Sequence, residues 1–99
     1  MTEVEKEVRK NKLVKIASHY GLCNQLGKTL EEIDELHEAI EGYMNGTDTK
    51  AHVIEEIADV EVMTAQLQLL LDAEEEVERV KEFKINRQIE RIGMDIKRA

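Results

Sequence analysis

The stretch that decides the fold is IADVEVMTAQLQLLL, residues 57–71. Its apolar side chains recur on nearly every side of a helix, namely at Ile57, Ala58, Val60, Val62, Met63, Ala65, Leu67, Leu69, Leu70 and Leu71. A helix that is apolar all round is expected to be buried all round. This segment therefore predicts the centre of a helical bundle or of a dimer interface.

Two amphipathic helices are expected before this segment. Thr2 followed by Glu5 is a capping-box pattern, so a first helix should run from there to a stop at Gly21. A second apolar stripe, at steps of three or four, predicts a helix over about residues 23–44 that ends before Asn45-Gly46.

The central helix and a fourth helix follow that turn. Asp48 or Thr49 is the expected N-cap of the central helix, which should end near Leu71. Asp72 and Glu75 have the spacing of a further cap, and the apolar side of a fourth helix is supplied by Val77, Val80, Ile85, Ile89, Ile92 and Ile96. The sequence predicts one all-α domain over residues 1–99, a four-helix antiparallel bundle completed by oligomerisation.

Composition narrows the classes of partner. The chain of 99 residues has 22 acidic and 14 basic side chains and a net charge of -8, which repels nucleic acids and anionic membranes. The longest uninterrupted apolar run, Leu69 to Leu71, is far too short to cross a bilayer. Cys23 has no intrachain partner and the N-terminus lacks a secretory pattern, so we expect a reduced, cytoplasmic protein. So short a chain is expected to form a homodimer or, as second choice, a homotetramer.

Two pairs of acids stand out on neighbouring helices. Glu32 and Glu35 are three apart on the second helix, and Glu56 and Asp59 are three apart on the central one. In so acidic a chain the default interpretation of either pair is a solvated helix face. In an antiparallel hairpin turning about residues 45–46, however, Glu35 would lie beside Glu56 and Glu32 beside Asp59.

Burial of these acids would require a cation. Glu56 and Asp59 share a helical stripe with Met63, Leu67 and Leu70, which should face protein. Carboxylates there would be partly desolvated and would repel one another. Clustered hard oxygen ligands suit Mg²⁺, with Mn²⁺ as an alternative.

The stretches QLGKTLEEIDEL, residues 25–36, and EIADV, residues 56–60, resemble the EExxE and ExxD motif pair of the MazG-like all-α nucleotide pyrophosphohydrolases. The resemblance covers roughly residues 20–90. It implies Mg²⁺-dependent conversion of a (deoxy)nucleoside triphosphate to the monophosphate and pyrophosphate, with Glu32, Glu35, Glu56 and Asp59 as metal ligands. A carboxylate or the metal would activate the attacking water, and Glu35 is our choice of assisting base.

Two alternatives stay open at this point. Phosphoribosyl-ATP pyrophosphohydrolase is a relative with a similar fold and similar acid motifs, and a panel of nucleotides would separate the two activities. An acidic, non-enzymatic helical module whose apolar third helix merely dimerises would explain the burial, but not the matched heights of the four acids.

Basic and aromatic side chains are candidates for the substrate. Lys28 lies four residues before Glu32, where it suits either a phosphate contact or an i,i+4 ion pair. Lys84 and Arg87 belong to a basic stripe with Arg91, and in the resembled family the last helix supplies such groups to the triphosphate; ordinary surface pairing is the alternative. Candidates for stacking on a base are Tyr20, Tyr43, Phe83, His19 and His37, each of which also suits a packing role.

Overall fold

The computed structural model describes residues 1–98, and these form four helices with no strand among them. Helix α1 spans Glu3–Tyr20, α2 spans Leu22–Asn45, α3 spans Lys50–Leu70 and α4 spans Glu74–Arg98. The prediction of an all-α fold with four helices is confirmed. No described helix is both long enough and apolar enough to cross a membrane.

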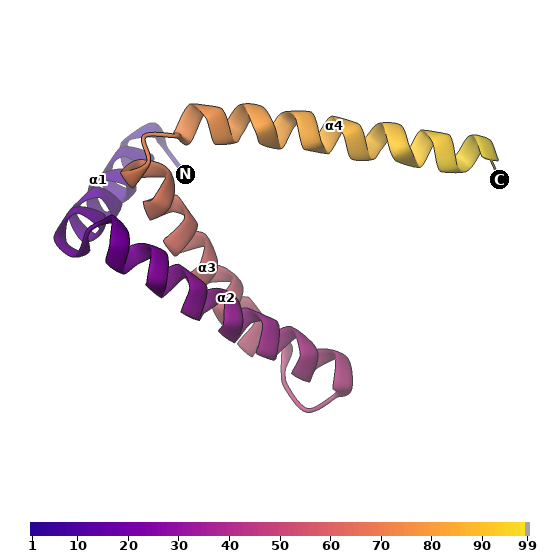
Figure 1. Ribbon diagram of the computed structural model, residues 1–99, viewed down its shortest axis with the longest axis horizontal. Coiled ribbons are helices and arrows are strands. Elements are labelled where there is room, and N and C mark those ends of the chain that lie inside the picture. Colours follow the sequence, from indigo (N-terminus) through magenta and orange to yellow (C-terminus); the bar gives the residue numbers. More distant parts are fainter. Residues whose placement is uncertain (99) are drawn as a thin grey trace.

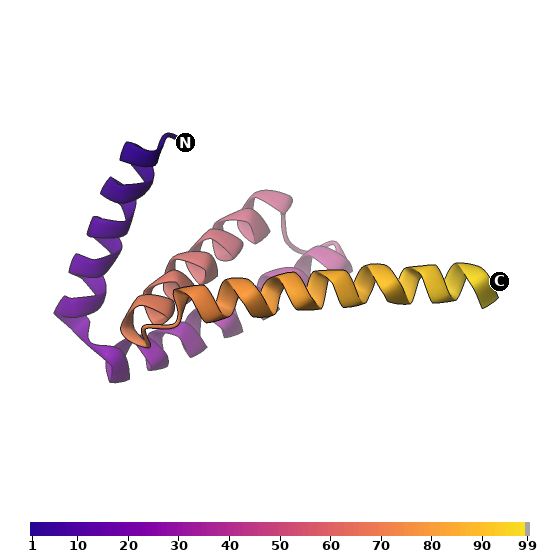
Figure 2. The same ribbon diagram turned by 90° about the horizontal axis from the view of Figure 1, so that it is seen from above.

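The body of the molecule is an antiparallel hairpin of α2 and α3. These two helices pack along each other, and α1 packs mainly against α3 near the open end of the hairpin (Figures 1 and 2). The turn between α2 and α3 is closed by Gly46 with a φ of 77°, a left-handed conformation that favours glycine. The hairpin that the sequence predicts from Asn45-Gly46 is therefore present.

The helix starts follow the predicted caps, with one exception. At α1 the Thr2 hydroxyl accepts a hydrogen bond from Glu5 N at 3.1 Å, and Thr2 N donates to the Glu5 carboxylate at 3.2 Å, which completes the capping box. At α3 the Thr49 hydroxyl accepts from His52 N at 3.2 Å. The assignment of Asp72 as a cap is wrong, because Asp72 has a φ of 50° and belongs to the turn that closes α3, while α4 starts at Glu74.

Helix α4 leaves the hairpin and runs away from it (Figures 1 and 2). Among the other helices of the described chain its backbone approaches only α3, and a Lys10–Glu74 ion pair of 3.4 Å links its first turn to α1. Val77 is half-buried, but the apolar side chains of α4 beyond it are exposed, from Val80 at 50% to Ile96 at 70%. A single chain thus builds a bundle from α1, α2 and α3, and the expected packing of the fourth helix along the other three is not formed within it.

Helix α3 is buried on one side only. Its buried residues are Glu56, Met63 and Gln66, whereas Ile57 and Val62 are 43% and 46% exposed. The expectation that this helix is buried all round is therefore not met within one chain. The reason is geometric, because α1 and α2 cover only part of its circumference and α4 turns away from it.

Candidate metal centre

The four predicted acids come together on the hairpin. One carboxylate oxygen from each of Glu32, Glu35, Glu56 and Asp59 lies within 4.8 Å of those of the other three. Glu32 and Glu35 come from α2, and Glu56 and Asp59 from α3. The convergence predicted from the antiparallel register is confirmed.

The cluster has a buried half and an exposed half. Glu32 and Glu56 are each 8% exposed, whereas Glu35 and Asp59 face solvent. The expectation that Asp59 shares the burial of Glu56 is wrong. Three residues advance a helix by about 300°, so Asp59 lies about 60° round α3 from Glu56, on the rim of the interface with α2. The rim leaves the cluster open to a ligand.

Each buried carboxylate has one oxygen without a partner. Glu32 Oε1 lies 3.2 Å from Lys28 Nζ, and Glu56 Oε1 lies 3.3 Å from His52 Nε2. Glu32 Oε2 and Glu56 Oε2 are fully buried and have no hydrogen-bond partner within residues 1–98. A buried charged oxygen without a partner is costly, and native structures seldom keep one without a function.

Electrostatic repulsion acts inside the cluster. The negative charge of Glu32 and a hydrogen-bonding interaction with the same carboxyl group, followed by desolvation and the charge of Glu56, raise the pKa of Glu35 above its usual range. Hydrogen bonds to Glu32 and Glu31 raise the pKa of Lys28, which stays protonated beside the acids. One lysine at the edge does not neutralise four carboxylates. The all-oxygen donor set, the two partnerless oxygens and the uncompensated negative charge fit a hard divalent cation.

Behind Glu56, the side chains of Asp48 and His52 form a series of hydrogen-bonded contacts that was not predicted from the sequence. Asp48 Oδ2 lies 2.6 Å from His52 Nδ1, and His52 Nε2 in turn contacts Glu56. Thr49 N donates to Asp48 Oδ1 at 2.7 Å and so fixes the far end. The hydrogen bond to Asp48 raises the pKa of His52, and the bonds from His52 and Thr49 lower the pKa of Asp48.

The signal for this arrangement is visible in the sequence as Asp48, His52 and Glu56 at successive spacings of four. Gly42 makes it possible, because a Cβ at that position would lie 2.7 Å from Asp48 Cβ. The close approach of the turn to α2 therefore requires glycine. Histidine held by a carboxylate on one side and touching a metal ligand on the other is a common way to orient such a ligand.

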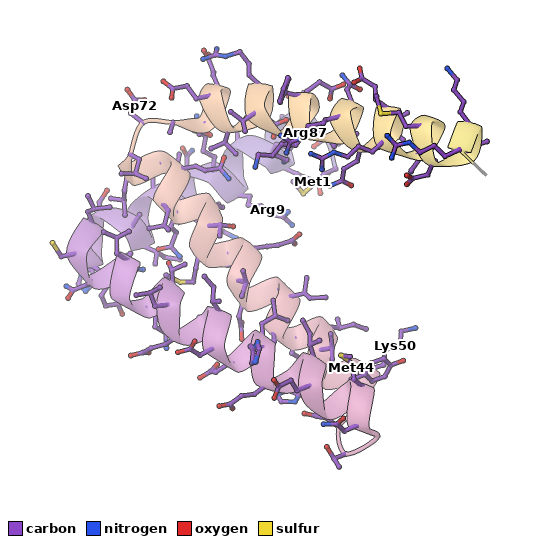
Figure 3. The ribbon with its side chains drawn as sticks, turned by 45° about the vertical axis from the view of Figure 1, so that its right-hand side comes forward. Met1, Arg9, Met44, Lys50, Asp72 and Arg87 are labelled. Atoms are coloured by element: carbon purple, nitrogen blue, oxygen red, sulfur yellow. The ribbon has the colours of Figure 1, made fainter. Side chains whose placement is uncertain are left out.

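The predicted basic residues divide into two groups. Lys28 lies at the cluster, where its ion pair with Glu32 confirms the i,i+4 pairing that the sequence suggested. Lys84 and Arg87 are exposed on α4, and this chain does not bring them to the acids. Arg87 instead sits over Phe83 of its own helix, 5.7 Å from the ring centroid, apart from the α2–α3 turn marked by Met44 and Lys50 (Figure 3).

No family model, curated protein or solved structure matches this chain. The site therefore defines a class by geometry alone: an all-α hairpin that gathers four carboxylates into a candidate centre for a divalent metal ion.

Proposed function

We propose that the protein is a Mg²⁺-dependent nucleotide pyrophosphohydrolase that converts a (d)NTP to the (d)NMP and pyrophosphate. The observation that carries the proposal is the convergence of Glu32, Glu35, Glu56 and Asp59, two of them buried with a partnerless oxygen each. An adventitious surface cluster would keep its oxygens in water. The resemblance of residues 25–36 and 56–60 to the MazG-like motif pair supplies the class of reaction.

The four carboxylates would hold Mg²⁺, which when bound attracts the phosphate oxygens and offsets the charge that develops during cleavage. Glu35 is the general base in this proposal. It lies on the exposed rim of the cluster, where water reaches it. The attacking water forms a bond to phosphorus, its proton passes to Glu35, and the bond between the α- and β-phosphates breaks.

Lys28 is assigned to the substrate phosphates. Its side chain is 49% exposed, and its Nζ already lies between the buried Glu32 and the surface Glu31. A triphosphate at the cluster would offer this ammonium stronger acceptors than either glutamate. Lys28 would then bridge the metal centre and the polyphosphate.

Lys84 and Arg87 require a second copy of the chain for the phosphate role. Their helix α4 points away from the acids of its own chain, and its apolar stripe is uncovered. A homodimer, or a homotetramer, would cover that stripe and the exposed Ile57 and Val62 of α3. Light scattering after size exclusion should give at least twice the chain mass of 11.4 kDa, and Ile89→Lys should shift the population to monomer.

The decisive experiment is pyrophosphate release from a panel of NTPs, dNTPs and phosphoribosyl-ATP with Mg²⁺. Glu32→Gln and Glu56→Gln should abolish release while circular dichroism stays helical, and Glu55→Gln, one residue along α3 and exposed, should remain active. Turnover of phosphoribosyl-ATP alone would select the histidine-pathway activity instead. No turnover, together with no saturable Mn²⁺ binding in the presence of a non-hydrolysable nucleotide, would leave a helical oligomerisation module.

A further inference from the structure

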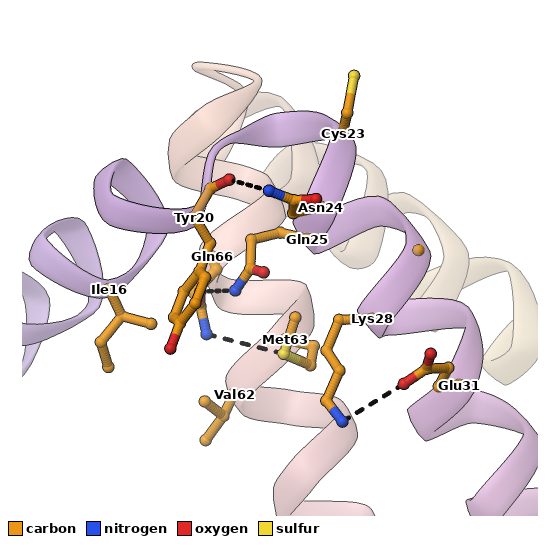
Figure 4. Close-up of a pocket in the computed structure, with 11 residues that line it drawn as sticks. Ile16, Tyr20, Cys23, Asn24, Gln25, Lys28, Glu31, Val62, Met63 and Gln66 are labelled. Atoms are coloured by element: carbon orange, nitrogen blue, oxygen red, sulfur yellow. Dashed lines mark hydrogen bonds and ion pairs between the residues drawn. The ribbon is translucent and has the colours of Figure 1, made fainter.

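An open cavity of about 660 Å³ lies between α1, α2 and α3, beside the metal centre (Figure 4). Its wall is mostly apolar, with Ile16 and Tyr20 from α1 and Met63 from α3 among the lining residues. Two buried amides, Gln25 from α2 and Gln66 from α3, also line it. A mostly apolar cavity with a few fixed polar groups is the usual form of a small-molecule site.

The two amides are deeply buried but incompletely paired. Gln25 is 5% and Gln66 2% exposed, and Gln25 Nε2 donates to Gln66 Oε1 at 2.7 Å. Gln66 Nε2 has only the Met63 sulfur, at 3.8 Å, and a thioether is a weak acceptor. The pair thus keeps the Gln66 Nε2 donor for a ligand.

Gly27 and Tyr20 shape the walls. Gly27 lies inside helix α2, where glycine destabilises by about 1 kcal/mol relative to alanine. A Cβ there would meet nothing within 4 Å, so packing does not demand glycine, and its effect is to keep the cavity wall recessed. Tyr20 also lines the cavity, and this residue is 53% exposed, which leaves its ring available for stacking (Figure 4).

Lys28 links the cavity to the acid cluster. This residue lines the cavity, and its Nζ is 3.2 Å from Glu32 Oε1. Gln25 precedes Glu32 by seven residues, and Gln66 follows Asp59 by seven. On both helices the amides therefore lie two turns, about 10.5 Å along the axis, from the acids. One elongated ligand can reach both places.

We propose that this cavity binds the nucleobase of the substrate nucleotide, with Gln25 and Gln66 hydrogen-bonded to its edge and Tyr20 stacked on its face. The inference rests on the proposed function, because the acids hold the phosphate end of the same molecule. A nucleobase edge presents donors beside acceptors, which a glutamine amide matches, and its faces suit an apolar wall. Gln25 and Gln66 are then the residues that determine base preference.

The first test needs neither metal nor phosphate. The side-chain amide resonances of Gln25 and Gln66 are followed by NMR while uridine, cytidine, adenosine and guanosine are titrated into the metal-free protein. At least one nucleoside should shift both amides saturably. Gly27→Leu, which adds an apolar side chain at a cavity-lining position where a Cβ meets nothing within 4 Å, should abolish the shifts.

The second test uses kinetics. Gln66→Met should raise KM for the preferred nucleotide at least tenfold and flatten the preference among bases. Gln68→Met, on the same helix but outside this cavity, should behave as the parent chain. The cavity inference is overturned by an active enzyme in which nucleosides shift neither amide and Gln66→Met and Gly27→Leu keep the parent's KM values. Saturable nucleoside shifts in a protein that hydrolyses no nucleotide would support the cavity and overturn the proposed function.

Discussion

Replacing Glu56 by glutamine tests whether repulsion among the four acids is real. The change removes one negative charge from a cluster whose ligand atoms lie within 4.8 Å of one another, and it preserves side-chain shape. Two unit charges at that separation repel by about 1 kcal/mol at the dielectric constant of water and by about 3.5 kcal/mol at an effective value of about 20. Glu56 is 8% exposed, but Glu35 and Asp59 face solvent, so the repulsion energy should fall between these two values.

Without metal, Glu56→Gln should therefore be more stable than the parent chain by roughly 1 to 3 kcal/mol. For a domain of this size each kcal/mol raises Tm by about 4 to 8 °C. The glutamine oxygen can still accept a hydrogen bond from His52 Nε2, which lies 3.3 Å from the glutamate oxygen it replaces. An increase in stability would be informative, because most substitutions destabilise a protein.

Mg²⁺ should reverse the order of stability. A ligand at one hundred times its Kd stabilises the folded state by about 2.7 kcal/mol, and the variant lacks one of the four ligands. Calorimetric melts in EDTA and across a Mg²⁺ series measure both effects, with Glu55→Gln as the matched control that should follow the parent throughout. A Glu56→Gln chain that melts below the parent in EDTA, or that Mg²⁺ stabilises equally, would refute the reasoning.

Three further predictions follow from the geometry. The raised pKa of Glu35 means that the folded chain binds this proton more tightly than the unfolded chain, so the contribution of Glu35 to metal-free stability is greatest at low pH and is lost as pH rises through that pKa. Melts from pH 4 to 8 in EDTA measure this loss, and saturating Mg²⁺ should remove it. His52→Ala should weaken Mn²⁺ binding by roughly 10- to 100-fold in calorimetric titration, whereas His37→Ala, which breaks a comparable i,i+4 contact to Glu41 outside the cluster, should not. Gly42→Ala should destabilise the chain by about 1 to 3 kcal/mol in urea unfolding, because the new Cβ would lie 2.7 Å from Asp48 Cβ. Gly93→Ala is the control and should not destabilise the chain, because a Cβ at that position meets nothing within 4 Å.

The acid cluster could be predicted because it depends on local rules that act along two adjacent helices. The Asn45-Gly46 turn fixes the antiparallel register, and a constant rise per residue then places Glu35 and Glu32 opposite Glu56 and Asp59. The caps at Thr2 and Thr49 follow the same logic, since each needs only a hydroxyl and the next turn of backbone. The burial of the four acids was harder to predict, because apolar periodicity identifies the buried side of a helix but does not resolve the 60° that separates Asp59 from Glu56.

The features that could not be predicted depend on contacts between elements. Periodicity showed that α4 has an apolar side but not what that side meets, and the turn at Asp72 sends the helix away from its own hairpin. The buried amide pair of Gln25 and Gln66 also could not be predicted from apolar periodicity, because glutamine counts as a polar residue although both side chains are buried.

Buried polar groups weaken a small core unless they are fully paired, and residues 1–98 bury three apolar side chains beside five polar or charged ones. Glu32 and Glu56 keep a partnerless oxygen each, and Gln66 keeps a donor with only a sulfur acceptor. Glu32 lies on α2, Glu56 and Gln66 lie on α3, and Gln66 lines the cavity. Leucine at these positions would stabilise the interface better than glutamate or glutamine. The unmet hydrogen-bonding capacity is therefore best explained by a ligand. Such a ligand would be charged and metal-bound at one end and would carry a hydrogen-bonding ring at the other.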